Sequence, residues 1–183
     1  EILYRYPKCG VISTEKAFML MHQFGYHIEG HEQIKVKEGD TFCFGKHTVT
    51  FVEAPMVHWP EVMVTLDLTD GVLFSADAFG SFMAPDGKLW NDDVNYDRDW
   101  IDENRRYLCN IVGKYGPHIQ LLLGKAAKVL DKIKIIAPLH GLVWHNNFDY
   151  ILDKYNHWST YEAEESGVLI AYASMYGGTE NAA

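Results

Sequence analysis

The sequence predicts a mixed α/β protein, and three observations lead to that fold class. Short runs that alternate apolar and polar residues fill most of residues 33–75 and are separated by turn residues, which is typical of a sheet. Between residues 99 and 158 the apolar residues recur mainly at helical spacing. A compact apolar run at residues 167–173 then leads into a hydroxyl- and glycine-rich stretch, which indicates a new β-loop-α unit.

Length, composition and charge narrow the possible functions. The 183 residues allow one domain and a remainder, and 48% hydrophobic content excludes a disordered or fibrous class. A net charge of -9 without any basic run argues against nucleic-acid binding. No apolar stretch approaches the roughly 20 residues that span a bilayer, and the N-terminal residues lack a signal-peptide pattern. We therefore expect a cytoplasmic protein that acts on a small or uncharged substrate.

The N-terminal third is expected to contain both helices and strands. Thr14 has the hydroxyl of a typical N-cap, and apolar residues follow it at helical spacing as far as Phe24. The next three strands are separated by turn residues at 38–40 and 45–46 and predict a β meander. The expected elements are the tail of a helix at residues 1–4, a strand at 9–13, a helix at 14–24, and strands at 33–36, 41–44 and 47–53.

The sheet is expected to continue before helices take over. Residues 69–71 read Thr-Asp-Gly, a strong signal for a turn between two strands. Asp99 or a neighbour can cap the next helix, and Pro117 lies where another begins. The expected elements are strands at residues 62–68 and 72–75, a long loop at 85–97, helices at 99–111 and 119–129, a buried strand at 132–137, and a helix at 148–158.

The three cysteines, Cys9, Cys43 and Cys109, are odd in number and far apart. This spacing fits neither a disulfide framework nor a Cys-x-x-Cys metal site. We expect reduced thiols that are buried in strands and helices and take no part in a functional site.

Three residues that can bind metal follow predicted strands. His58 comes after the strand at 47–53, Asp77 after the strand at 72–75, and His140 after the strand at 132–137. Ligands gather at strand ends, where loops are held on a rigid frame, and two imidazoles with a carboxylate suit iron or zinc. From position alone, two ordinary loop histidines and a turn aspartate remain an open alternative.

The residues around these three positions form three distinctive stretches. They read Pro55-Met56-Val57-His58-Trp59-Pro60, Leu73-Phe74-Ser75-Ala76-Asp77-Ala78-Phe79-Gly80, and Ala137-Pro138-Leu139-His140-Gly141-Leu142-Val143-Trp144. In content, order and separation they resemble flavodiiron proteins, and the resemblance covers essentially the whole chain. It implies a metallo-β-lactamase-like αββα domain with a di-iron centre, followed by a flavodoxin-like domain with FMN, in an enzyme that reduces dioxygen to water or nitric oxide to nitrous oxide.

The resemblance also implies a role for each candidate ligand. His58 looks like a ligand of one iron, Asp77 like the carboxylate that bridges both irons, and His140 like a ligand of the other. The family takes its remaining ligands from a His-x-Glu-x-Asp-His motif, which this sequence does not contain. We therefore expect a fragment with only part of the di-iron domain. Glu61 and Ala76 depart from the residues usual in the family, and neither change removes a ligand.

A candidate flavin site follows the apolar run at 167–173. A loop of this kind before a helix can bind an anion through backbone N–H groups and hydroxyls. The stretch resembles the family's FMN phosphate loop, with Gly178 where Asn is frequent. Its residues are Ser174, Met175, Tyr176, Gly177, Gly178 and Thr179. The expected organisation is a di-iron domain portion at residues 1–158, a linker at 159–166, and the truncated start of the FMN domain at 167–183.

Partners and alternatives complete the sequence-based hypothesis. The resemblance implies electron delivery by a small rubredoxin-like protein or domain, a homodimer, and no membrane partner. A metal-dependent hydrolase of the same fold is the alternative enzyme class. A catalytically inactive fragment is the third possibility, because three ligands cannot fill the coordination of two irons. Among the other histidines, only His145 is a candidate support for a metal ligand.

Overall fold

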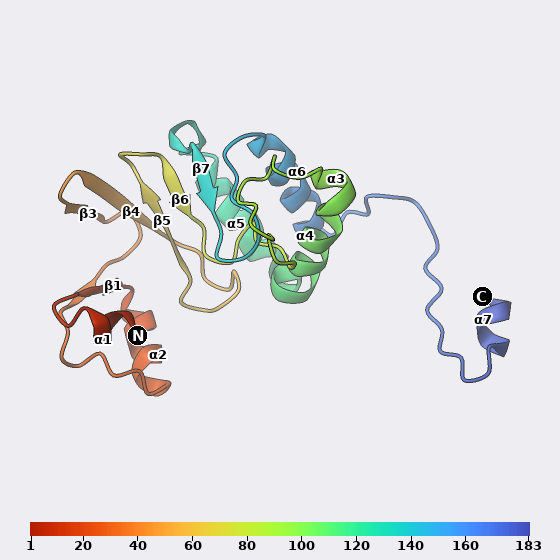
Figure 1. Cartoon of the computed structure of the whole chain (residues 1–183), viewed down its shortest axis with the longest axis horizontal. Coiled ribbons are helices and arrows are strands. Elements are labelled where there is room, and N and C mark those ends of the chain that lie inside the picture. The colour runs from red at the N-terminus through yellow and green to blue at the C-terminus, as the bar shows by residue number, and fades with distance from the viewer.

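The computed structural model describes residues 1–183 and has three visible parts (Figure 1). A sheet lies in the middle with helices gathered on one side of it. A small N-terminal unit lies beside the first strands of the sheet, and the last residues extend away from the body as an isolated segment. No helix has the length and apolar character that crossing a membrane requires.

The N-terminal unit contains α1 (Ile2–Arg5), β1 (Val11–Ser13), α2 (Glu15–Gln23) and β2 (Gln33–Lys35). The predicted N-cap is confirmed, because the Thr14 hydroxyl accepts a hydrogen bond from the Ala17 amide at 3.2 Å. The expectation that residues 33–36 belong to the meander is wrong: β2 pairs in parallel with β1 in a separate two-stranded sheet. The helix between β1 and β2 reverses the chain, which makes a parallel pair possible.

The main sheet has five strands in the order β3-β4-β5-β6-β7. Neighbouring strands from β3 to β6 are antiparallel, whereas β7 runs parallel to β6. The strands are β3 (Thr41–Phe44), β4 (His47–Glu53), β5 (Met63–Asp67), β6 (Val72–Phe74) and β7 (Ile135–Ala137). Each lies within the run predicted for it, so alternation, turn residues and apolar runs together located all five.

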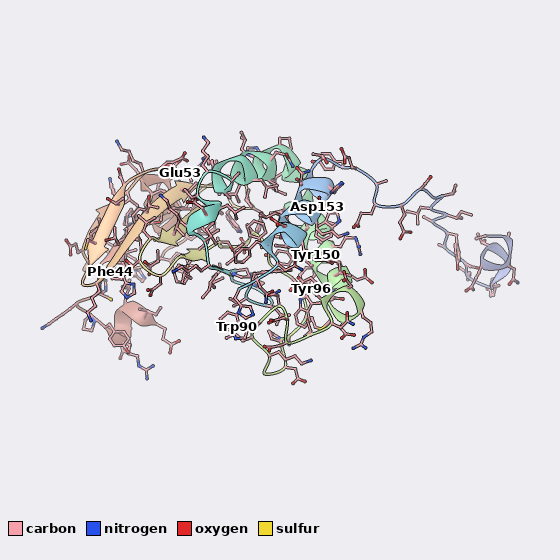
Figure 2. All side chains as sticks on the ribbon, turned by 90° about the horizontal axis from the view of Figure 1, so that it is seen from above. Phe44, Glu53, Trp90, Tyr96, Tyr150 and Asp153 are labelled. Atoms are coloured by element: carbon pink, nitrogen blue, oxygen red, sulfur yellow. The ribbon has the colours of Figure 1, made fainter.

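Strand direction determines which loops meet. Glu53 at the end of β4 pairs with Met63 at the start of β5, and Phe74 at the end of β6 pairs with Ala137 at the end of β7. The loops at residues 54–62, 75–81 and 138–141 therefore leave the same edge of the sheet, which we call the site edge. The turns at residues 45–46 and 68–71 leave the other end, which we call the turn edge. In Figure 2, Phe44 and Glu53 mark these two ends.

The helical part begins slightly earlier than the sequence suggested. Asn95 caps α3 by accepting a hydrogen bond from the Arg98 amide at 3.2 Å, whereas α4 begins beside Asp99 as expected, with Trp100 at its N-cap position and no side-chain cap bond. The Asp99 carboxylate instead pairs with the Arg98 guanidinium. The helices are α3 (Tyr96–Asp99), α4 (Ile101–Tyr107), η1 (Leu108–Val112), η2 (Gly113–Tyr115), α5 (Gly116–Ala126), η3 (Leu130–Lys132) and α6 (Phe148–Ser159).

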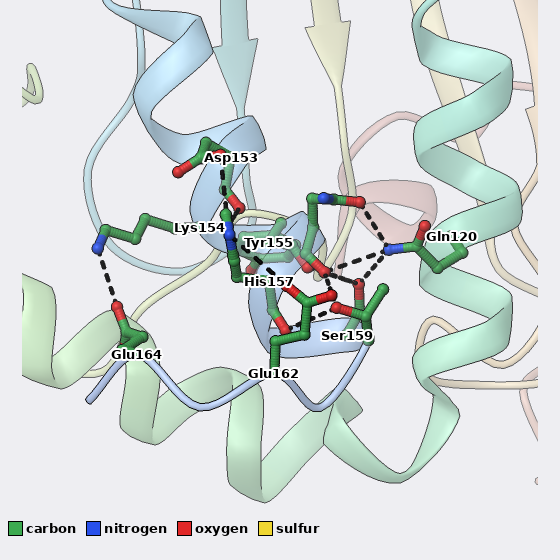
Figure 3. A network of polar contacts seen from close by, with 10 residues as sticks. Gln120, Asp153, Lys154, Tyr155, His157, Ser159, Glu162 and Glu164 are labelled. Atoms are coloured by element: carbon green, nitrogen blue, oxygen red, sulfur yellow. Dashed lines mark hydrogen bonds and ion pairs between the residues drawn. The ribbon is translucent and has the colours of Figure 1, made fainter. Parts of the chain in front are cut away.

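The core lies between the sheet and α4, α5 and α6. Eighteen buried residues form one cluster, which includes Val64 and Leu66 of β5, Ile119 of α5 and Ile151 of α6. Burial of each such aliphatic side chain stabilises the fold by about 1.5–3 kcal/mol. Polar contacts join α5 and α6, since Gln120 donates from Nε2 to the Ser159 hydroxyl at 2.7 Å (Figure 3). The helices and the sheet thus form a single core.

The C-terminal segment differs from the expectation. Residues 167–173 form no strand, and Val168 and Leu169 are 90% and 92% exposed. A strand needs a neighbour to satisfy its backbone hydrogen bonds, and none lies beside this segment. Glu164 fixes the start of the segment through Arg105 and Lys154, and the short helix α7 (Gly178–Ala182) closes the chain. Figure 3 shows the Lys154 contact.

All three cysteines are free thiols, but their expected burial is wrong because all are exposed. Cys43 lies in β3, which is an edge strand of the sheet and is mostly exposed along its length. Cys109 lies in η1, whose buried residues are its neighbours Leu108 and Val112. Apolar character alone did not reveal which side of each element faces water.

Candidate metal centre

The structure brings His58, Asp77 and His140 together at the site edge. Nε2 of His58 lies 3.6 Å from Oδ2 of Asp77, and Nε2 of His140 lies 3.5 Å from Oδ1 of the same carboxylate. The Asp77 side chain is 14% exposed, that of His58 is 30% exposed and that of His140 is 57% exposed. One carboxylate thus lies between two imidazoles in a partly open setting.

These distances suit shared metal ligands better than hydrogen bonds. A nitrogen–oxygen separation of about 3.6 Å is too long for a hydrogen bond. Two ligands that each lie about 2.1 Å from one metal ion are roughly 3.0–3.5 Å apart. Because each oxygen of Asp77 faces a different imidazole, the carboxylate has the arrangement needed to contact two neighbouring ions. The residues present therefore fit part of a two-metal centre.

The loops that hold these side chains are tied to each other. The Leu139 amide donates to the Ala76 carbonyl at 2.9 Å, and the Ser81 amide donates to the His140 carbonyl at 3.3 Å. Ala76 and Phe79 have positive φ angles of 53° and 66°, which side-chain-bearing residues rarely adopt. Such conformations persist only where surrounding contacts enforce them. The loop around Asp77 is therefore shaped by its neighbours.

Tyr107 is a further member of this group that the sequence did not single out. Its hydroxyl lies 3.4 Å from Oδ1 of Asp77, and its ring centre lies 5.7 Å from that of His140. Burial, followed by the negative charge of Asp77, raises the pKa of Tyr107, so its hydroxyl remains a proton donor. A tyrosine on the buried face of a helix looks like core in the sequence, and no local signal distinguishes it.

His145 does not have the environment expected of a residue that supports a metal ligand. Its Nε2 lies 2.7 Å from Oδ1 of Asp92, and its ring stacks on Trp90 with centres 4.5 Å apart. Trp90 lies on the helical side of the molecule (Figure 2). His145 therefore belongs to a surface network with Asp92 rather than to the support of His140.

A second histidine–aspartate group lies at the turn edge. Donor atoms of His47, Asp67 and Asp70 all lie within 4.8 Å of one another. Nδ1 of His47 lies 2.7 Å from Asp67 and 3.7 Å from Asp70. Burial opposes the ionisation of Asp67, but hydrogen bonds from the Thr69 amide and from His47 outweigh it and lower the pKa of this carboxyl. The sequence did not single out this group, because its members meet only when β4 and β5 pair.

The six candidate flavin-binding residues lie on the C-terminal segment and not beside the site edge. Met175 and Tyr176 are 86% and 94% exposed. Gly177 has a φ of 79° and directly precedes α7, so the chain does turn from a loop into a helix here. The segment is a largely exposed loop that leads into a short helix, and the main pockets of the structure are lined by residues outside it.

Comparison with known proteins identifies similar sequences. A family model described as "ODP family beta lactamase" matches residues 2–141. A nitric oxide reductase of Moorella thermoacetica is 34% identical over 97% of this chain and 43% of its own length. A coenzyme F420H2 oxidase of Methanothermobacter marburgensis is 32% identical over 100% of this chain and 45% of its own length. The chain thus spans less than half the length of these curated relatives.

Solved structures show the same fold. A flavoprotein of Thermotoga maritima superimposes with a TM-score of 0.83 and 29% identity, over 95% of this chain and 42% of that one. The flavodiiron protein of Giardia intestinalis gives a TM-score of 0.75 and 28% identity, over 81% of this chain and 35% of that one. The predicted α/β class and its metallo-β-lactamase-like architecture are confirmed.

Proposed function

Because this chain belongs to the ODP family of β-lactamase-like domains, we propose that it is part of a flavodiiron oxidoreductase that reduces dioxygen or nitric oxide. The main support is the Asp77 carboxylate, whose two oxygens face two different imidazoles. The relatives are named as reductases and oxidases, which favours this class over the hydrolase alternative.

We assign the candidate ligands by their positions. His58 would bind one iron through Nε2, His140 would bind the other through Nε2, and Asp77 would bridge them. The iron pair would supply the electrons and the coordination positions for a diatomic substrate. The protein's own part is to fix the separation and orientation of these three side chains, which it does with loops that leave one edge of a rigid sheet.

Tyr107 would act beside the bridging carboxylate. Its raised pKa keeps a proton on the hydroxyl, which points to Oδ1 of Asp77. A neutral donor at this position stabilises negative charge on the carboxylate.

The proposal also includes a flavin site and protein partners outside the metal centre. Residues 159–166 would serve as a linker, and residues 167–183 would begin a flavodoxin-like domain. Ser174, Thr179 and the backbone around Gly177 and Gly178 would hold the phosphate of FMN. When bound in this way, FMN would supply redox chemistry to the enzyme of which this chain is part. A relative named flavorubredoxin and a rubredoxin:oxygen oxidoreductase support a rubredoxin-like donor. A homodimer in the cytoplasm is the expected assembly.

Metal titration of the purified chain tests the ligand assignment. Co²⁺ can replace iron and gives visible absorption that reports bound imidazole. We expect the chain to bind Co²⁺ and His140→Ala to raise the dissociation constant by about tenfold or more. His157→Ala is the matched control, because His157 is an exposed histidine of α6 paired with Asp153. Equal affinity in the His140 variant and the control would refute the assignment.

A further inference from the structure

One face of α4 holds the loop that contains Asp77. Trp100, which precedes the first helical residue, and Asn104 and Tyr107 are spaced at i, i+4 and i+7 and so project from the same side. The Trp100 indole donates from Nε1 to the Ser81 hydroxyl at 2.6 Å, and Asn104 donates from Nδ2 to the Gly80 carbonyl at 2.6 Å. Both donors are buried, with 4% and 0% of their surface exposed.

Ser81 is the junction between three segments. Its hydroxyl receives the bond from Trp100 on α4, and its amide donates to the carbonyl of His140. Its side chain also packs on Gly141, where an added Cβ would lie 2.0 Å from the hydroxyl oxygen. Ser81 therefore connects α4 to the loop of Asp77 and to the loop of His140 at one point.

The second contact fixes the same loop at Gly80, five residues after Ser75, where β6 has ended. Asn104 satisfies the buried carbonyl of Gly80, and the ring of Tyr107 closes over Gly80, where an added Cβ would lie 3.0 Å from the ring. An unsatisfied buried carbonyl costs about 1–3 kcal/mol. These bonds therefore favour the strained conformations of Ala76 and Phe79 on either side of Asp77.

We propose that Trp100 and Asn104 are positioning residues that set the separation between Asp77 and His140. They touch neither side chain. They act through Ser81, which connects the two loops, and through Gly80, which lies in the loop of Asp77. The relevance to metal binding rests on the proposed function, whereas the positioning of the loops does not.

Hydrogen exchange on the metal-free chain tests the positioning directly. The amides of Ser81 and Leu139 bond across the two loops and report their contact. In Trp100→Phe, which keeps an aromatic ring but loses the donor, we expect protection of these two amides to fall about tenfold more than that of the amides within α5. Asn104→Leu should give the same pattern.

The matched control is Gln120→Leu. Gln120 also donates a side-chain hydrogen bond to a buried serine hydroxyl, Ser159, but it joins α5 to α6 and bonds to neither the loop of Asp77 nor that of His140 (Figure 3). This variant should lower protection in α5 and α6 without a selective loss at Ser81 and Leu139. If Trp100→Phe and Gln120→Leu lower protection in the same proportion everywhere, Trp100 is merely structural and the proposal is wrong.

A double-mutant cycle guards against nonspecific effects. Ser81→Ala removes the acceptor, so Trp100→Phe and Ser81→Ala together should lower protection of the Leu139 amide no more than either alone. Additive losses would overturn the role given to Ser81 as the junction.

Co²⁺ binding provides the second measurement. Trp100→Phe should raise the dissociation constant for Co²⁺ about tenfold, as loss of a supporting contact typically does, while Gln120→Leu leaves it unchanged. A chain that does not bind Co²⁺ at all would contradict the proposed function and leave the exchange result to decide the positioning. A selective exchange effect with unchanged Co²⁺ affinity would refute the claim that this separation matters for metal.

Discussion

Each end of the sheet carries a histidine–aspartate group, but only the aspartate at the turn edge has close hydrogen-bond partners on both oxygens. At the turn edge, Asp67 accepts bonds from the Thr69 amide at 2.8 Å and from His47 at 2.7 Å, so each of its oxygens has a close partner. At the site edge, the nearest nitrogens to Asp77 lie at 3.5 and 3.6 Å, beyond a normal hydrogen bond. A histidine–aspartate group whose bonds are complete stabilises a turn. The group at the site edge lacks such close bonds, which fits the metal-binding role that we propose for it.

The backbones at the two edges differ in the same way. The turn edge uses Gly71, whose φ of 74° is natural for glycine. The site edge has positive φ at Met56, Ala76 and Phe79, which all have side chains. Strain of this kind is thus present in the loops of the site edge and absent from the turns at residues 45–46 and 68–71, as is common at functional sites.

The largest expected effect on stability comes from replacing one glycine by alanine at each edge. A Cβ at Gly71 would lie 2.6 Å from the backbone carbonyl of Lys132, whereas a Cβ at Gly141 would lie 2.0 Å from the Ser81 hydroxyl, which can rotate away. We expect Gly71→Ala to lower the free energy of unfolding by about 2–5 kcal/mol, and Gly141→Ala by about 1–3 kcal/mol. Urea unfolding measures both. A larger loss for Gly141→Ala would contradict this order of the two effects.

The next prediction concerns replacing an aspartate by the uncharged, isosteric asparagine at each edge. Asp77→Asn should weaken Co²⁺ binding about tenfold to a hundredfold, because an amide is a poor bridging ligand, with little change in the urea midpoint. Asp67→Asn should leave Co²⁺ binding unchanged and lower the urea midpoint, because it removes the acceptor of His47. If Asp67→Asn abolished Co²⁺ binding, the turn edge would be the metal site and the comparison would have to be reversed.

The turn edge should also respond to acid. The folded state lowers the pKa of Asp67, so the stability from this carboxylate is present above its ordinary pKa of about 3.9 and is lost as pH falls below it. The difference in stability between the unmodified chain and Asp67→Asn should therefore shrink as pH falls through this range. Urea unfolding at several pH values measures it, and a difference that grows toward acid would contradict the sign.

The smallest expected effect concerns Glu164, which lies at neither edge. Burial opposes its ionisation, but bonds from Arg105 and Lys154 prevail and lower its pKa from 4.5 to about 2. Its stabilisation, about 1 kcal/mol for partly exposed ion pairs, is complete above pH 4.5 and is lost as pH falls toward 2. Glu164→Gln should remove this dependence in thermal unfolding. A pH-independent difference between the two proteins would show that Glu164 acts through packing.

Local patterns predicted the strands and the meeting of His58, Asp77 and His140, because alternation locates strands and strand ends locate loops. Features that depend on distant neighbours were missed. Nothing near residues 33–35 shows that β2 pairs with β1 rather than β3. Asn95 and Asp99 are both good caps, and only the folded chain shows that Asn95 is used. Tyr107 looked like core, and the exposure of Cys43 follows from the edge position of β3. The ligand roles themselves stay predictions.

The exposed run at residues 168–170 has a practical consequence for anyone who handles the protein. Val168, Leu169 and Ile170 are apolar, accessible and without a strand partner, so thermolysin, which cuts before such residues, should cleave here first. The ion pairs of Glu164 lie before the cut, and the core residues end at Trp158, so the body should survive digestion intact. The same three residues can also pair with their counterparts in another molecule, so concentrated samples should be most prone to aggregate through this segment.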